Sequence, residues 1–189
     1  MMIRRAEPGE AQSVAELVAT AFLPMRATAY LVPEPERRHR IITADFRILV
    51  EHALEHGQVD VVDEGPAAAV WFPVTGPVPE PADYEARLAA ATGDCLERFQ
   101  LLDKLFEANH PAEPHHHLAF LAVHPDRQGR GIGSALLEHH HAALGGTAAY
   151  LEASHPKSRD LYARHGYQAR EPFALPDGTL FWPMWRPGR

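Results

Sequence analysis

Hydrophobic residues recur with helical spacing in three stretches of the chain. In each stretch they fall on one side of a helical wheel, as in an amphipathic helix that packs on a core. The first stretch ends at Pro24, and the second follows Pro33 and Pro35 and stops at Gly57. The apolar positions are Ala11, Val14, Leu17, Val18, Ala21 and Phe22; Ile42, Phe46, Leu49 and Ala53; and Cys95, Phe99, Leu102 and Phe106. We therefore expect three helices, the third after a proline-rich loop at residues 73–81.

Short apolar runs bounded by turn residues predict strands between and after these helices. Two of the runs are joined across residues 63–66 and predict a hairpin. A glycine-rich turn leads into a further helix, and another short helix is ended by Gly166. The expected strands are residues 3–6, 59–62, 67–72, 118–123, 148–152, 167–173 and 180–185, and the last short helix is 157–165. This mixed order predicts an α/β fold with a largely antiparallel sheet flanked by helices.

Length and composition narrow the class of protein. The 189 residues contain no obvious linker, so we expect one domain over 1–189. Acidic residues (25) outnumber Lys and Arg (18), which argues against nucleic acid as a partner and tolerates a cationic amine. Cys95 is the single cysteine, so no internal disulfide can form. The N-terminus lacks the apolar region of a secretory signal, and the sequence has no run of about 20 apolar residues. We expect a cytoplasmic protein with no membrane role.

The most informative stretch is an apolar strand followed by a glycine-rich turn and the start of a helix. The turn and helix start contain Gln128, Gly129, Arg130, Gly131, Ile132 and Gly133. Successive backbone N–H groups at a helix N-terminus attract anions, and glycine allows phosphate to approach closely. A Walker A loop would need a lysine after the glycines, and a dinucleotide loop would need G-x-G-x-x-G where this chain has G-x-G-x-G. A phosphorylated cofactor of another kind is favoured.

The strand ending Val123-His-Pro125 and the loop Gln128-Gly-Arg-Gly-Ile-Gly133 resemble motif A of the GNAT acyltransferases. The stretch from Ser158 to Tyr167 is similar to their motif B, with Ser158 where the family usually has Asn. The resemblance implies a sheet that splays at the cofactor site and acetyl-CoA (coenzyme A) as the cofactor. It also implies that backbone groups of one strand bind pantetheine and that the loop binds pyrophosphate. The implied cofactor residues are Leu121, Ala122, Val123, Gln128, Gly129, Arg130, Gly131, Ile132, Gly133, Ser134, Ser158 and Tyr162.

Acetyl transfer to an amine needs a proton donor for the departing thiolate and a route for the amine proton. The resemblance places Tyr162 near the coenzyme sulfur, as general acid. Base candidates are His115 and His117, which share one strand face, and Glu152 on the neighbouring strand, while His116 faces the other side. An α-amine titrates near about 8 and could need only ordered water. A strand N–H near Leu121 or Val123 would meet the oxyanion.

Two histidine triplets, 115–117 and 139–141, raise the question of a metal. Neither triplet alone directs three ligands at one point, because side chains alternate on a strand and fan out by about 100° per residue on a helix. We expect no metal site. Separately, Phe22, Met25, Tyr30 and Trp71 are either ordinary core or the lining of an apolar acceptor pocket.

The resulting hypothesis is an acetyl-CoA-dependent N-acetyltransferase acting on the primary amine of a small molecule, such as an aminoacyl-type antibiotic or metabolite. Four further segments are similar in order and spacing to an antibiotic-acetylating branch of the family: 68–72, 111–114, 151–154 and 182–188. Two alternatives stay open, a noncatalytic acyl-CoA-binding regulatory module and a protein or peptide N-acetyltransferase. The C-terminal aromatic segment could also join the sheet of a second copy in a homodimer.

Overall fold

A computed structural model describes residues 1–63 and 66–189, so two residues of the predicted hairpin turn, Glu64 and Gly65, lie outside the described part. The strands form a mixed sheet in the order β1-β2-β3-β4-β5-β8-β6, with β7 paired to β8. Their bounds are β1 Ile3–Arg5, β2 Gln58–Val62, β3 Ala67–Val74, β4 His115–Val123, β5 Ala148–Ala153, β6 Gln168–Ala169, β7 Phe173–Ala174 and β8 Leu180–Arg186. Within residues 1–63 and 66–189, β4–β5 is the only parallel pair, which confirms the predicted, largely antiparallel sheet.

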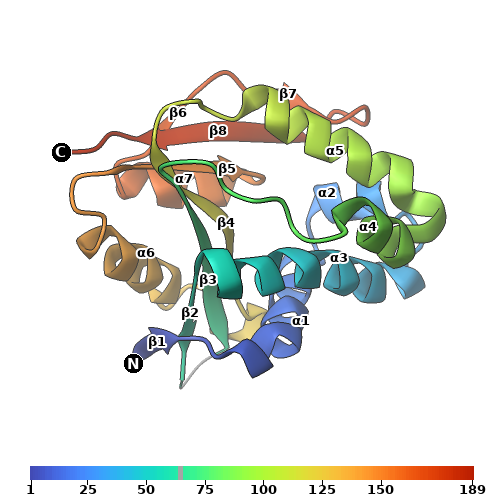
Figure 1. Cartoon of the computed structure of the whole chain (residues 1–189), viewed down its shortest axis with the longest axis horizontal. Helices are drawn as coiled ribbons and strands as arrows, with labels where there is room; N and C mark the ends of the chain where they lie inside the picture. Colours follow the sequence, from blue (N-terminus) through green and yellow to red (C-terminus); the bar gives the residue numbers. More distant parts are fainter. Residues whose placement is uncertain (64–65) are drawn as a thin grey trace.

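The helices divide between the two faces of the sheet (Figure 1). The larger hydrophobic core involves α1 (Ala11–Phe22), α2 (Arg26–Leu31), α3 (Pro35–His56), α4 (Tyr84–Thr92) and α5 (Leu96–Asn109). The smaller core involves α6 (Ile132–Ala142) and α7 (Pro156–Arg164). Among the described residues, no helix combines the length and apolar character needed to cross a membrane.

The predicted helical stripes become α1, α3 and α5. Short 3-10 turns, Pro8–Glu10 and Gly93–Cys95, precede α1 and α5, so Cys95 stands just outside its helix. A third 3-10 turn, Pro125–Arg127, follows β4. The helices α2 and α4 were not predicted, because α2 has six residues and α4 buries only Leu88 and Thr92.

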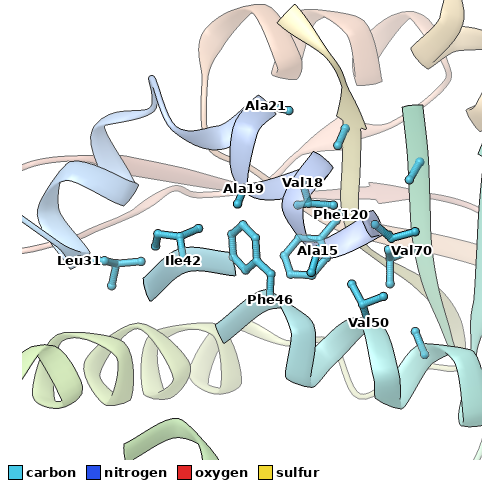
Figure 2. Packing of buried hydrophobic residues seen from close by; sticks show 14 of the residues in the cluster. Ala15, Val18, Ala19, Ala21, Leu31, Ile42, Phe46, Val50, Val70 and Phe120 are labelled. Carbon is cyan, nitrogen blue, oxygen red and sulfur yellow. The ribbon is translucent and has the colours of Figure 1, made fainter. Parts of the chain in front are cut away.

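Aromatic rings hold the larger core between α1, α3 and β4. The ring centroids of Phe46 in α3 and Phe120 in β4 lie 4.5 Å apart, and Phe22 of α1 packs edge-on against both rings. Figure 2 shows Phe46 and Phe120 among the smaller side chains of Ala15 and Val50. Large rings fill the space that alanines leave, and this packing fixes the end of α1 against β4.

Two irregularities of β4 prepare the site. Pairing between β4 and β5 runs from His115 to Leu118 and then stops, so the remainder of β4 has no partner on that side. The register with β3 shifts between Val70 and Trp71, which leaves Ala119 as the extra residue of a β-bulge. The sheet is therefore splayed between β4 and β5, as the resemblance implied, and the bulge bends β4 close to this gap.

Candidate active site

A cleft of about 450 Å³ opens where β4 separates from β5. Its walls come from the end of α1, the end of β4, the glycine-rich loop, the start of α6 and one face of α7. Ten of the predicted cofactor residues line it: Leu121, Val123, Gln128, Gly129, Gly131, Ile132, Gly133, Ser134, Ser158 and Tyr162. One continuous surface thus joins the gap between the strands to the start of α6.

The glycine-rich loop has the backbone conformation that a phosphate cradle requires. Gly129 and Gly131 have φ angles of 75° and 77°, which side chains disfavour, and Gly131 is the N-cap of α6. The first bond of the helix runs from the Ala135 N–H to the Gly131 carbonyl oxygen. The N–H groups of the first helical turn therefore point towards the cleft with the positive end of the helix dipole.

Other predicted cofactor residues lie differently. The Ala122 side chain is buried in the larger core on the far face of β4, so only its backbone could reach a ligand. Arg130 is exposed and does not line the cleft, whereas Arg127, Lys157 and Arg164 do. These three cations were missed because the motif drew attention to the loop alone. Together they place positive charge on the wall of the cleft.

A second, smaller cavity of about 170 Å³ lies beside the cleft on the larger core's side of the sheet. The two share five lining residues, Phe22, Met25, Leu121, Ser158 and Tyr162. A ligand held in the cleft could thus meet a second molecule at this junction. We call the smaller space the acceptor cavity.

Two of the four suggested pocket residues lie at this junction, namely Phe22 and Met25. Trp71 is fully buried and stacks on His140 at 3.9 Å, on the opposite face of the sheet. The ring of Tyr30 lies under the guanidinium of Arg98. Trp71 and Tyr30 therefore act as structural residues.

Glu152 of β5 and His117 of β4 form a hydrogen-bonded pair on the wall of the acceptor cavity. The His117 Nε2 atom lies 2.9 Å from Glu152 Oε2, and the two side chains are 21% and 7% exposed. Burial tends to raise the pKa of Glu152, but His117, together with smaller effects of Tyr150 and His110, holds the pKa below its ordinary value. The carboxylate is therefore ionised at neutral pH.

The second oxygen of this carboxylate, Oε1, is buried and has no hydrogen-bond partner among residues 1–63 and 66–189. The Tyr150 hydroxyl lies close enough to this carboxylate to help lower the Glu152 pKa, and it donates to the Asn109 carbonyl oxygen at 3.3 Å. A buried carboxylate oxygen without a donor is costly unless a ligand or water supplies one. This atom is thus a candidate receptor for a cationic or N–H group.

His115 lies deeper than His117 and lines neither cavity. It is fully buried, its Nδ1 lies 2.6 Å from the Glu113 carbonyl oxygen, and its Nε2 lies 3.1 Å from His110 Nε2. Of the two predicted histidines, His117 lines the acceptor cavity and His115 does not. His116 points to the opposite face, as predicted, with its Nδ1 3.0 Å from His140 Nε2.

The structure also brings together a set that the sequence did not suggest, His110, His117 and Glu152. Their ligand atoms lie within 4.8 Å of one another, whereas atoms that share a tetrahedral zinc ion are about 3.4 Å apart. These residues could hold a metal ion only after closing in. As placed, they suit proton transfer better. His110 follows α5 in a connecting segment, so no spacing rule could have linked it to the pair.

Tyr162 of α7 stands at the junction of the two cavities. Its ring is buried, 5.9 Å from that of Tyr167, and burial raises the pKa of its hydroxyl above the ordinary range. The phenol therefore stays protonated at physiological pH and can donate.

Comparison with known proteins agrees with this geometry. Residues 100–169 match the acetyltransferase (GNAT) domain family. Across its whole length the chain is similar to the histone acetyltransferase HPA2 and related acetyltransferase from Corynebacterium glutamicum, with 27% identity, 96% of that chain covered and a TM-score of 0.69. Mosquito arylalkylamine N-acetyltransferase like 5b (18% identity, TM-score 0.65) and Drosophila melanogaster polyamine N-acetyltransferase (20%, 0.64) share the fold, each over 98% of this chain and 99% of theirs. Residues 100–169 therefore match the GNAT acetyltransferase domain family, and the whole chain shares its fold with known acetyltransferases.

Proposed function

We propose that this chain is an acetyl-CoA-dependent N-acetyltransferase that acts on the primary amine of a small molecule. The observation that carries the proposal is the meeting of two cavities at Tyr162, with the Glu152–His117 pair on the wall of the smaller one. A proton donor and a proton acceptor thus line the same cavity. Acyl transfer to an amine needs both groups.

The residues of the cleft fit coenzyme A. The unpaired edge of β4, with Leu121, Ala122 and Val123, offers backbone groups to the pantetheine amides, much as a strand would. Gly131 and the first turn of α6 offer N–H groups to the pyrophosphate, and Arg127 and Lys157 add charge. Acetyl-CoA when bound supplies an activated acetyl thioester.

Ser158 borders both cavities in the place where the family usually has an amide side chain. Its hydroxyl can donate and accept hydrogen bonds but cannot reproduce the paired contacts of Asn. We assign it a weaker contact to the cofactor. Ser134 also borders the cleft, and its Oγ lies 3.0 Å from His165 Nε2, which orients the hydroxyl at the start of α6.

The chain's own groups then divide the proton transfers. Oε1 of Glu152 receives the ammonium of the acceptor, and the Glu152–His117 pair takes up its proton so that the amine becomes a nucleophile. The Tyr162 hydroxyl donates a proton to the departing thiolate. A backbone N–H of β4, near Leu121 or Val123, stabilises negative charge on the acetyl oxygen.

Several observations support a small-molecule acceptor. The acceptor cavity of about 170 Å³ fits a compact group better than an extended peptide. The names of two similar structures refer to arylalkylamine and polyamine N-acetyltransferases. The segments 68–72, 111–114, 151–154 and 182–188 are similar in order and spacing to puromycin N-acetyltransferase, which favours an aminoacyl-type amine.

The test has two stages. Calorimetric titration with acetyl-CoA should show saturable binding, with NAD and ATP as controls that do not bind. Thiol release is then measured with a panel of primary amines and with histone-tail and N-terminal peptides. Amine-dependent release supports the proposal, and binding without any acceptor-dependent release indicates a noncatalytic acyl-CoA-binding module. Release with peptides alone would instead identify a protein acetyltransferase.

A further inference from the structure

The acceptor cavity is apolar except for a few polar groups. Most of its wall comes from aliphatic and aromatic side chains of α1, α2, α3, α5, β4 and β8, including Leu31, Phe46, Leu49, Leu102, Phe106 and Phe181. The polar groups on the wall include Glu152 and His117, and the junction residue Tyr162 lines the same cavity. A ligand that fills this space would therefore place an apolar body against the helices.

Two other polar side chains on the wall, Thr28 and Ser154, already have partners. The Thr28 hydroxyl donates within its own turn, at 2.8 Å to the Met25 carbonyl oxygen. The Ser154 Oγ lies 3.4 Å from the Met25 sulfur. These side chains are poor candidates for binding a polar ligand tail, because a new bond would have to replace an existing one.

The volume limits the apolar body to about one ring. An apolar protein cavity of about 150 Å³ lined by Leu, Ile and Phe binds benzene, and the acceptor cavity measures about 170 Å³. The rings of Phe22, Phe46 and Phe120 meet one another at 4.5–5.9 Å along its wall, which is the spacing at which a further aromatic ring packs well.

The charges limit the ligand to one cation. Among the described residues that line the cavity, Glu152 is the sole acidic side chain. Asp45 of α3 and Asp103 of α5 belong to helices of the cavity wall, but neither side chain lines the cavity. Asp103 accepts a hydrogen bond from the Tyr84 hydroxyl at 2.8 Å. A second ammonium or guanidinium in this space would lack a counter-ion, and an unpaired buried charge is strongly disfavoured.

We infer that the acceptor is a monocationic primary amine that carries a single aromatic ring, or an apolar group of similar size, on a short linker. The inference rests on the proposed function for the identity of the reacting amine, since Glu152 would receive that amine. The protein should therefore select against diamines and guanidino amines, although a polyamine N-acetyltransferase has the same fold.

The first experiment compares matched amines with the wild-type protein. Phenethylamine should have a kcat/KM at least about tenfold above that of agmatine or putrescine. Agmatine and putrescine lack the ring that packs on the cavity wall, and each brings a second positive charge that has no partner there. Equal or better turnover of the dications would overturn the inference and leave the proposed function intact.

A binding measurement tests the inferred acceptor class separately from the proposed acetyltransferase activity. Phenethylamine and agmatine are titrated into the protein saturated with coenzyme A, and no turnover is needed. Preference for phenethylamine by about tenfold supports the inference even if no amine is acetylated, in which case the proposed function fails alone. Absence of saturable phenethylamine binding would overturn the inference.

A paired substitution tests the charge argument directly. Leu49 is half-buried and lines the cavity, so Leu49→Glu introduces a second acid and Leu49→Gln is its neutral control. Both should weaken phenethylamine use, but only Leu49→Glu should raise the ratio of agmatine to phenethylamine turnover, by about tenfold. An equal ratio in the two folded variants would contradict the role of charge. If either fails to fold, as judged by thermal melting, the wild-type comparison still decides.

Discussion

Replacing Tyr162 by Phe is the sharpest test of the proposed chemistry, because it removes one hydroxyl and keeps the ring. The side chain is 8% exposed and packs 5.9 Å from the Tyr167 ring. Phe fills the same space, so the smaller core should stay packed. We expect the free energy of unfolding to change by less than about 1 kcal/mol.

The expected loss of turnover follows from the role of the hydroxyl. General acid catalysis contributes about 10²–10⁴-fold, and Tyr162 is the only phenol among the described residues that line the junction. We therefore expect kcat to fall about 10²–10³-fold, or about 3–4 kcal/mol in the barrier. Because burial raises the pKa of Tyr162, its hydroxyl stays protonated in the assay range, and the loss should not depend on pH from about 6 to 9.

The assay is thiol release under saturating amine, combined with calorimetric titration of acetyl-CoA. Tyr167→Phe is the matched control, since Tyr167 is a buried neighbour whose hydroxyl lies 2.9 Å from His141 Nε2 and which lines neither cavity. The control should keep kcat within about twofold. The reasoning is refuted if Tyr162→Phe retains wild-type kcat, and a parallel loss of acetyl-CoA affinity would reassign Tyr162 to binding.

Three further changes separate acceptor, cofactor and stability. Glu152→Gln should lower kcat/KM for the amine about 10²-fold and leave acetyl-CoA affinity unchanged by calorimetry, because Glu152 lines the acceptor cavity and not the cleft. Gly131→Ala forces a side chain into a φ of 77° at a cost of about 1–2 kcal/mol and should weaken acetyl-CoA binding about tenfold, whereas Gly76→Ala in an exposed loop should change neither stability nor affinity. Burial, with a smaller effect of Asp103, raises the pKa of Asp45 to about 8, so the folded state keeps a proton that the unfolded chain releases, and stability falls as pH rises from about 4 to 8. In denaturant titrations, Asp45→Asn should remove this slope, which amounts to about 4 kcal/mol of stability between pH 4 and pH 7; an unchanged slope would contradict the assignment.

The fold was predictable wherever burial repeats with a regular period. The stripes of α1 and α3 lie against the larger core and appear in the sequence as long runs at helical spacing. The helix α4 has no such run, since two of its nine residues are buried, and α2 is shorter than two full turns. Their ends depend on contacts with α3 and α5 that local sequence does not encode.

The candidate site also has parts that the sequence predicted and parts that depend on tertiary packing. The glycine turn before α6 was predictable because its residues are neighbours in the chain, as are Gly129 and Gly131. The His117–Glu152 pair was foreseeable because neighbouring strands alternate their side chains. The cations Lys157 and Arg164 were missed, because their position over the cleft depends on how α7 packs beside α6, which is a tertiary effect.

The bulge at Ala119 explains why strand alternation could not fully describe β4. Strict alternation would put Leu121 and Val123 on the same face as His117. The extra residue reverses the phase: Phe120 joins the larger core on the side of His117, and Leu121 and Val123 turn to the smaller core and the cleft. One inserted residue thus gives the acceptor cavity its histidine and aromatic wall, and gives the cleft its aliphatic floor. If this account is right, deleting Ala119 should abolish acetyl-CoA binding more severely than replacing Leu121 by Ala, because the deletion turns the whole end of the strand over.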